Sequence, residues 1–291
     1  MKVILSPNPY RDVKLRAAQA AKRILEQAGV ETMVCLPFTP DDGGKLDLPP
    51  QLPLTPLDEA LRQADMLICF GGDGTILHAA KDANRYQVPI LGVNMGSVGF
   101  MAELESGELN LLSRLNEGKY TIEERIMLDV CVRREGKIVF TDTALNDAVV
   151  TKGAVARVLN LEVLGDRVPL TTYAGDGVII ASPTGSTAYS MAAGGPVVEP
   201  TARNLVVTPI CAHSLRVTPM VLDQRRVVWV RLAPGSRRSA YLSVDGGRAF
   251  KILSGDRVEV RMSRQVTRLA KLTGRSFYEL VHQKLGRGWQ T

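Results

Sequence analysis

One acidic residue surrounded by glycines is the first feature of this sequence that could do chemistry. Residues 70–75 read Phe-Gly-Gly-Asp-Gly-Thr, with Asp73 at the centre. They follow a buried strand predicted at 65–70 and precede a helix predicted at 75–84, and a helix N-terminus presents free N–H groups to phosphate. The arrangement predicts an anion site that holds one carboxylate. The alternative is an ordinary strand-to-helix turn, in which Gly and Asp are common.

Two other short segments carry glycine, amide or carboxylate groups. Residues 92–100 follow the next predicted strand, at 90–94, so we expect this glycine-rich loop to flank the same crevice as residues 71–75. Asn146 and Asp147 place an amide beside a carboxylate within a predicted strand, where neighbouring side chains point to opposite faces. The structural alternatives are a packed glycine-rich connection and a polar pair near a solvated strand end.

A long uncharged stretch contains the fourth candidate segment. The 22 residues 177–198 include no charged side chain, and residues 182–190 are dense in hydroxyl groups and glycine. This composition suits a pocket wall that hydrogen-bonds a polar ligand, because an ordinary exposed loop of this length usually carries Lys or Glu. Its prolines and glycines exclude a lipid-facing helix.

Several familiar site signatures are absent. The dinucleotide fingerprint fails because Leu77 stands where its third glycine would be, and no Walker A, HExxH, HRD or G-x-S-x-G sequence is present. Zincins, protein kinases and the commonest serine hydrolases are therefore excluded. The four cysteines lie far apart and form no CxxC pair, which disfavours zinc or thioredoxin-like chemistry and suits reduced thiols. We assign no residue as a metal ligand.

The pattern of predicted secondary structure changes near residue 121. The first part alternates strands and helices, which predicts a doubly wound parallel sheet, with strands at 2–5, 32–36, 65–70 and 90–94 and helices at 11–28, 57–64, 75–84 and 108–116. The second part has a period of two and many β-branched residues, which predicts a β-sandwich-like domain, with strands at 124–134, 137–151, 155–164, 178–181, 226–232, 240–244 and 257–262. A C-terminal helix at 276–285 is expected to return to the first domain. We therefore predict an α/β domain of residues 1–121 and 272–291 and a β-rich domain of residues 122–271.

Length and composition support two folded domains. The chain has 291 residues, of which 45% are hydrophobic and 23% charged, so global disorder is excluded. Its net charge of +6 hides an asymmetry, because residues 225–291 carry 15 basic and 4 acidic side chains. A basic stretch suits nucleic acid, anionic lipid, a small polyanion or a solvated face. The apolar run at 2–5 is too short for a signal peptide, so we expect a cytoplasmic protein.

The glycine, amide and hydroxyl segments together resemble the motifs of the NAD kinase family. That family combines a GGDGT turn, an Asn-acid pair, an Asp-Gly pair, a TGSTAY stretch and a Gly-Gly-Pro turn. The same order stands here at residues 71–75, 146–147, 176–177, 184–189 and 194–196. GGDGT alone is shared with diacylglycerol kinases, sphingosine kinases and phosphofructokinase-like folds, but the full set is specific.

The resemblance implies a phosphotransferase with an alcohol acceptor. An NAD kinase of bacterial type moves the terminal phosphoryl group of ATP, or of polyphosphate in some members, to the 2′-hydroxyl of the adenosine ribose of NAD and so makes NADP. The resemblance implies NAD and ATP as small-molecule partners, a divalent metal ion, Mg²⁺, as cofactor, and a homodimer or homotetramer built mainly through the second domain. Because these ligands are small polyanions, we expect no nucleic-acid and no membrane partner, and we assign part of the basic excess to attracting the ligands.

The resemblance also assigns roles to residues. A ribose hydroxyl is a poor nucleophile and needs a carboxylate within hydrogen-bond reach, so Asp73 is the candidate catalytic base. By the family match, Asn146 and Asp147 hold the ribose and adenine region, and Asp176 the nicotinamide side. The other candidate binding residues are the backbone of Gly74, the pocket walls Phe100 and Thr184, the polar contacts His78 and Arg157, and the adenine-pocket residues Thr187, Ala188, Tyr189, Ser190, Met191 and Ala192.

The sequence departs from the family pattern at three positions. Asp147 stands where Glu is commoner, Ala192 replaces a small hydroxyl residue, and Gly247 replaces the amide residue of a family Asp-Gly-Gln. Two other functions remain open at this point: a lipid kinase that shares GGDGT, and a dinucleotide-binding sensor without turnover. The hydroxyl-rich stretch at 184–190 disfavours the first, and the carboxylate of Asp73 disfavours the second.

Overall fold

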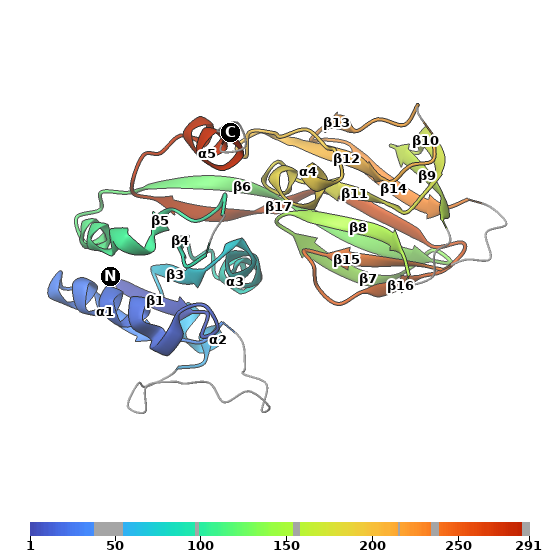
Figure 1. Ribbon diagram of the computed structural model, residues 1–291. Helices are drawn as coiled ribbons and strands as arrows, with labels where there is room; N and C mark the ends of the chain where they lie inside the picture. Colours follow the sequence, from blue (N-terminus) through green and yellow to red (C-terminus); the bar gives the residue numbers. More distant parts are fainter. Residues whose placement is uncertain (38–54, 97–98, 154–157, 215, 234–238, 287–291) are drawn as a thin grey trace. The chain divides into compact units, whose positions relative to one another are not determined.

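The chain divides into two compact units (Figure 1). A computed structural model describes residues 1–37, 55–96, 99–153, 158–214, 216–233 and 239–286. The first unit comprises Met1–Glu124 and Thr267–Thr291, and the second comprises Arg125–Val266. The sequence predicts these boundaries a few residues away, after 121 and after 271. Both divisions fall inside long strands, β6 (Thr121–Arg134) and β17 (Arg257–Lys271), where no linker composition marks them.

The first unit is an α/β unit built on parallel strands. Its sheet has the order β2-β1-β3-β4, and each neighbouring pair is parallel. These strands are β1 (Lys2–Pro7), β2 (Glu31–Val34), β3 (Met66–Gly71) and β4 (Ile90–Asn94), with the short β5 (Leu104–Glu105) and the end of β17 also pairing with β4. Its helical segments are η1 (Val13–Leu15), α1 (Arg16–Gln27), α2 (Leu57–Leu61), α3 (Asp73–Arg85), η2 (Ser106–Leu115) and α5 (Phe277–Leu285). Within the described ranges, none of the helices is long and apolar enough to cross a membrane.

The central strands of this sheet are buried along their whole length. Every residue of β3 and of β4 is buried, which is the state of parallel strands covered on both faces. α1 packs its small side chains Ala17, Ala18 and Ala21 into the same core. The predicted doubly wound sheet is thus confirmed, with two corrections to its helices. The helix predicted at 11–28 begins only at Arg16, after left-handed φ values at Lys14 and Leu15. The helix predicted at 108–116 is the 3₁₀ segment η2, in which Glu108 leaves helical φ/ψ values.

The second unit is a β-sandwich, as predicted (Figure 1). One sheet runs β10-β9-β14-β17, with β6 pairing to β17 and β7 pairing to β6, and the other runs β13-β12-β11-β8-β15-β16. Alternate residues of both sheets, such as Val132, Val150 and Val260, meet in one core. The further strands are β7 (Lys137–Ala144), β8 (Asp147–Lys152), β9 (Leu159–Gly165), β10 (Val168–Gly175), β11 (Gly177–Ala181), β12 (Asn204–Ile210), β13 (Met220–Asp223), β14 (Val227–Leu232), β15 (Ala240–Val244) and β16 (Phe250–Ile252).

The structure corrects two predicted strands, because the strand predicted at 257–262 continues to Lys271 as β17 and the strand predicted at 137–151 is divided. Of the strand predicted at 155–164, residues 155–157 lie outside the described residues, and β9 begins at Leu159. Residues 137–151 are predicted as a single strand but form two, β7 and β8, which are separated by Leu145 and Asn146. Neither glycine nor proline stands at the break, so the strongest turn residues do not mark it in the sequence. The Asn146-Asp147 pair therefore begins a strand instead of lying inside one.

A buried carboxylate fastens the end of β17 within the first unit. Glu103 accepts hydrogen bonds from the backbone N–H groups of Leu272 (2.8 Å) and Thr273 (2.6 Å) and from the Thr273 hydroxyl (2.6 Å), and Lys271 Nζ lies 2.5 Å from its other oxygen. Burial opposes ionisation of Glu103, but these contacts outweigh it and hold its pKa below the usual value. The C-terminal segment is thus held by charge as well as by strand pairing.

Candidate active site

The turn with Asp73 joins the end of β3 to the start of α3. Gly72 is the N-cap of α3, with φ −103° and ψ −172°, and Asp73 is the first helical residue. No side chain of the described residues caps this N-terminus. The N–H group of the exposed Gly74 is therefore suited to an anion, whereas that of Thr75 donates to the carbonyl of Gly72 at 2.9 Å.

The close approach of Gly71 to Thr75 fixes the shape of this turn. A Cβ atom on Gly71 would lie 2.2 Å from Thr75 Oγ1, so only glycine fits. The same hydroxyl accepts a hydrogen bond of 3.3 Å from Asn8 Nδ2, at the end of β1. The N–H of Met95 donates to the carbonyl of Gly71 at 2.9 Å, which joins the loop after β4 to the turn after β3.

The Asp73 carboxylate is held by the loop that follows β4. Its Oδ2 accepts from the N–H of Phe100 at 2.8 Å, and its Oδ1 accepts from the N–H of Met101 at 3.1 Å. A Cβ atom on Gly99 would lie 2.7 Å from Oδ1, so glycine at that position lets the loop approach the carboxylate. The two glycine-rich loops therefore meet at Asp73, and these N–H bonds orient a carboxylate of the kind that can accept a hydroxyl proton.

Two other predicted site residues of this unit lie near the Asp73 turn, His78 along the chain and Phe100 in space. His78 is exposed on α3, four residues after Gly74 and hence on the same face of the helix. The side chain of Phe100 is half-buried, and its backbone N–H makes the contact with Asp73. Backbone geometry rather than the aromatic ring thus links Phe100 to the carboxylate.

In the second unit, the carboxylate of Asp245 fixes the Asn146-Asp147 segment. It accepts hydrogen bonds from the N–H groups of Leu145 (2.7 Å), Asn146 (2.8 Å) and Asp147 (3.0 Å). Three successive N–H groups that turn to one carboxylate cannot all continue a strand ladder, and this explains the break between β7 and β8. Asp245 itself lies in the left-handed region, with φ +48°.

The side chains that this break presents are both buried. Asn146 is 8% exposed, and its Oδ1 has no hydrogen-bond partner among the described residues. Burial, and next to it the charge of Asp245, raise the pKa of Asp147 to about 7. An unpaired acceptor beside a carboxyl group that titrates near neutral pH is suited to the hydroxyl and amino groups of a polar ligand.

The turn at residues 182–187 packs directly against Asn146. The Ser182 N–H donates to the carbonyl of Asn146 at 2.8 Å, and its hydroxyl donates to that of Leu145 at 2.5 Å. A Cβ atom on Gly185 would lie 2.2 Å from the backbone carbonyl oxygen of Asn146, so the Thr-Gly-Ser segment needs its glycine here. Behind the turn, the buried Arg125 donates from Nη1 to Thr184 Oγ1 at 3.4 Å.

The predicted adenine-pocket residues differ in their surroundings. They belong to the short segments η3 (Thr184–Thr187) and α4 (Tyr189–Ala192). Ser190 is buried, and its hydroxyl bonds to that of Thr208 at 2.7 Å. Thr187, Ala188 and Met191 are half-buried, whereas Tyr189 and Ala192 are exposed.

Asp176 lies at the opposite end of β11 from this group. In the ladder between β11 and β8, Ala181 faces Asp147 while Gly177 faces Thr151, so the length of the strand, roughly 14 Å, separates the two ends. Asp176 pairs there with Lys152 Nζ at 2.7 Å. The structure thus separates Asp176 from Asn146 and Asp147, and the predicted Arg157 lies outside the described residues.

Two residues of this site have little sequence signal of their own. Arg125 stands in a charged run, Glu-Glu-Arg, which gives no sign that only the arginine is buried. Asp245 stands in an Asp-Gly-Gly turn whose composition suggests only a hairpin. Its contact with residues 145–147 depends on the pairing of β15 with β8, which a sequence pattern does not specify.

A carboxylate at a helix N-terminus and a hydroxyl-lined turn beside an unpaired amide are the parts of a nucleotide-dependent transferase. The profile of the ATP-NAD kinase N-terminal domain matches residues 53–120, and that of the ATP-NAD kinase C-terminal domain matches residues 145–272. The chain is 35% identical to the NAD kinase of Acetivibrio thermocellus over 286 residues, which are 98% of this chain and 97% of that one. It is 45% identical to the NAD kinase of Symbiobacterium thermophilum over 231 residues, 79% of this chain and 81% of that one.

Two solved structures share the fold. The yeast NADH kinase, crystallised with NADH, superposes with a TM-score of 0.82 at 24% identity and covers 100% of this chain and 89% of its own. The NAD kinase from Archaeoglobus fulgidus, crystallised with ATP, has a TM-score of 0.73 at 21% identity, with 99% and 98% covered. The chain belongs to the NAD kinase family, and its activity is that of an NAD kinase.

Proposed function

We propose that this protein transfers the terminal phosphoryl group of ATP to the 2′-hydroxyl of the adenosine ribose of NAD. The observation that carries the proposal is the Asp73 carboxylate, fixed by two backbone N–H groups at the uncapped N-terminus of α3. The ligands of the two solved structures, NADH in the yeast enzyme and ATP in the archaeal one, support this pair of substrates.

Asp73 would act as the general base for the ribose hydroxyl. The N–H groups of Phe100 and Met101 hold both of its oxygens, which orients the carboxylate before the substrate binds. As the hydroxyl attacks, its proton passes to the carboxylate. The N–H group of Gly74, in the first turn of α3, would contact the donor phosphates, because negative charge is favourable at a helix N-terminus. His78, on the same helix face, is our candidate for a further polar contact.

The second unit would hold the dinucleotide. Asn146 Oδ1, which has no partner among the described residues, would accept from a hydroxyl or amino group of the ligand. Asp147 would bind the neighbouring ribose hydroxyls, and the hydroxyl-rich turn would line the adenine side. The remaining binding residues in the proposal are Phe100, Arg157, Asp176, Thr184, Thr187, Ala188, Tyr189, Ser190, Met191 and Ala192.

A divalent cation, Mg²⁺, would enter together with the donor phosphates. Within the described part of the chain, no three His, Cys, Asp or Glu side chains gather as a metal cage. Mg²⁺ is commonly held by phosphates and waters with only one or two carboxylates, so a site without a protein cage fits it. When bound, the ion would offset negative charge on the transferred group.

A coupled assay tests the proposed substrates. Pure protein is incubated with NAD, ATP and Mg²⁺, and the product is measured with an NADP-specific dehydrogenase. We expect NADP to accumulate only when all three components are present. Formation of no NADP would overturn the proposal and leave a dinucleotide sensor or a lipid kinase, and replacing ATP by polyphosphate in the same assay tests the donor range.

We also infer that the protein works in the cytoplasm. The four cysteines are all free thiols, and Cys35 and Cys69 are buried, which suits a reducing compartment. Burial raises the pKa of Cys35 to about 11 and that of Cys69 to about 12, so neither is a reactive thiolate near neutral pH.

We further infer a homodimer or homotetramer, as the resemblance to the family implies. Analytical ultracentrifugation tests this assembly, and a purely monomeric species at all concentrations would contradict it.

A further inference from the structure

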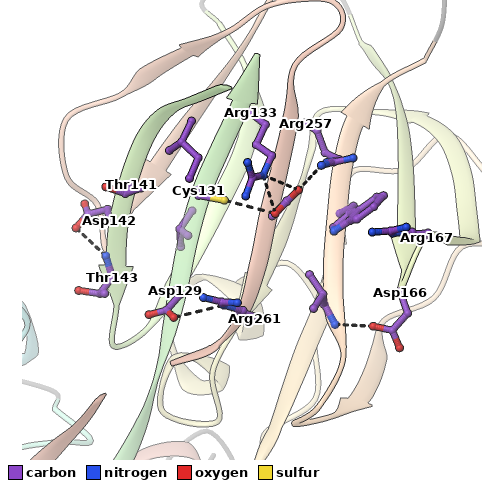
Figure 2. Close-up of a pocket in the computed structure, with 15 residues that line it drawn as sticks. Asp129, Cys131, Arg133, Thr141, Asp142, Thr143, Asp166, Arg167, Arg257 and Arg261 are labelled. Carbon is purple, nitrogen blue, oxygen red and sulfur yellow. Dashed lines mark hydrogen bonds and ion pairs between the residues drawn. The ribbon is translucent and has the colours of Figure 1, made fainter. Parts of the chain in front are cut away.

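The second unit contains a cavity that none of the predicted site residues lines. It has a volume of about 840 Å³ and lies on β7, β6, β17 and β14, beside the hairpin of β9 and β10 (Figure 2). The alternate residues of these strands, such as Val132, Val228 and Val260, belong to the sandwich core, so the cavity lies on the outer face of the sheet. We call it the Trp229 cavity. Its volume falls within the range of roughly 300–1,000 Å³ that is typical of small-molecule sites.

Trp229 lies between two guanidinium groups in this cavity. The Arg257 guanidinium is 3.9 Å from the centroid of the indole ring, and that of Arg167 is 5.4 Å from it. The indole Nε1 and the Nε of Arg257 are both buried and have no hydrogen-bond partner among the described residues. Buried donors without an acceptor are destabilising, so these two atoms call for an oxygen atom from elsewhere.

The carboxylates of the cavity are already engaged. Glu259 lies 3.3 Å from Arg133 Nε and 2.5 Å from Arg257 Nη2, and it also contacts the Cys131 thiol at 3.6 Å. Asp129 pairs with Arg261 at 3.5 Å, as Figure 2 shows. Asp166 accepts from Arg226 and from the N–H of Val227. The unmatched groups are therefore donors, and the missing partner is an acceptor.

Arg167 adds a guanidinium on a residue whose backbone conformation is unusual for arginine. Asp166 and Arg167 form the turn between β9 and β10 with φ values of 49° and 76°. Such left-handed positions in two-residue hairpins favour Gly or Asn and are unfavourable for a long side chain. Within the described ranges no carboxylate pairs with Arg167. An arginine held at a position that favours glycine indicates a use for its side chain.

We propose that the Trp229 cavity binds a small, multiply charged oxyanion, a phosphorylated or polycarboxylate metabolite. Arg167 is its cation, and the indole Nε1 and Arg257 Nε become its donors after a small shift of the side chains that bury them. The ion pairs of Arg133, Arg257 and Arg261 keep these side chains oriented. The inference does not depend on the proposed phosphoryl transfer.

Tryptophan fluorescence tests this site, because the chain has only two tryptophans. In a Trp289→Phe background, Trp229 is the sole reporter, and inorganic pyrophosphate and citrate are titrated at constant ionic strength. We expect a saturable change in Trp229 emission with one or both probes, and their relative affinity separates phosphate from carboxylate recognition. Arg167→Ala should raise the apparent Kd about tenfold, which corresponds to the loss of one charge-assisted hydrogen bond. The Kd of Arg167→Lys should lie between that of wild type and that of Arg167→Ala.

Controls make each outcome decisive. Arg231→Ala, which removes an arginine of β14 that pairs with Glu162 instead of lining the cavity, should leave the titration unchanged. Arg167→Ala should keep its NAD kinase activity within about twofold, so loss of fold is recognised by activity and by circular dichroism. No change in emission at millimolar probe, or an equal change in wild type and Arg167→Ala, would overturn the proposal. A signal that depends on protein concentration instead of probe would overturn it in favour of a second copy of the chain on this face.

Discussion

At the scale of single residues, Asp73 has both carboxylate oxygens engaged by backbone N–H groups. We expect Asp73→Asn to lower kcat about 10²–10⁴-fold, because an amide oxygen still accepts one of these bonds but cannot take the proton of the ribose hydroxyl. KM for NAD should change much less. The coupled assay measures both constants, and Asp82→Asn on the same helix is the matched control. An unchanged kcat in Asp73→Asn would remove Asp73 from the role of base.

Asp147 gives a prediction about stability and pH. Its pKa of about 7 in the folded state lies above the value of roughly 3.9 expected for the unfolded chain. The folded state therefore binds this proton more tightly, and the stability it contributes is complete below about pH 4 and is lost as the pH rises through about 7. We expect the free energy of unfolding to fall over this window in wild type, and to fall less in Asp147→Asn.

Urea unfolding at a series of pH values measures the effect of Asp147. The comparison of interest is the difference between wild type and Asp147→Asn, because groups other than Asp147 and its charged neighbour Asp245 contribute similarly in both proteins. Parallel stability curves for the two proteins would show that Asp147 keeps an ordinary pKa in the folded state. The same variant should weaken NAD binding, since its amide cannot act as a charged acceptor for ribose hydroxyls.

At the scale of elements, the break between β7 and β8 depends on one carboxylate. Asp245→Ala would leave the N–H groups of Leu145, Asn146 and Asp147 without their acceptor. We expect a loss of about 3 kcal/mol in the free energy of unfolding and a rise of about tenfold in KM for NAD. Asp223→Ala, which removes an exposed turn carboxylate, should cost less than about 0.5 kcal/mol. A destabilised Asp245→Ala with an unchanged KM would show that the break does not position the ligand-binding residues.

The same break shows how far the sequence could be interpreted. The apolar runs of β3 and β4 and the period of two in the sandwich are local properties, and they predict both kinds of sheet. The GGDGT turn is also local, so Asp73 can be found from its neighbours in the chain. Asp245 and Arg125 act on residues 98 and 59 positions away, respectively. No periodicity encodes such contacts, because they depend on which strands become neighbours.

At the scale of the whole molecule, the basic end of the sequence is not a bare positive surface. Many of its basic side chains pair with carboxylates, most of which lie in earlier segments. Among the described residues these pairs include Arg225–Asp223, Arg226–Asp166, Arg231–Glu162, Arg257–Glu259, Arg261–Asp129, Arg268–Glu124, Lys271–Glu103 and Arg275–Glu108. The excess seen along the sequence is thus largely neutralised in space.

This neutralisation predicts a weak dependence on salt. We expect KM for NAD to rise less than about threefold between about 50 and 200 mM KCl at fixed Mg²⁺, because paired charges contribute little to long-range attraction. Initial-rate measurements at each salt concentration give the constant. A steep rise in KM with no change in kcat would show instead that unpaired basic residues steer the substrates.

The contacts that Glu103 makes with residues 271–273 also affect the order in which the two units finish folding. Translation completes the sandwich, Arg125–Val266, before it reaches Lys271 and Thr273. Until those two residues emerge, Glu103 lacks the ammonium, hydroxyl and N–H groups that stabilise its charge in the folded unit, and a buried carboxylate without partners is strongly unfavourable. The first unit therefore cannot finish folding until the C-terminal segment joins it, although most of its residues are synthesised first. A chain that stops short of Lys271 would keep every residue of the sandwich but leave Glu103 without these partners.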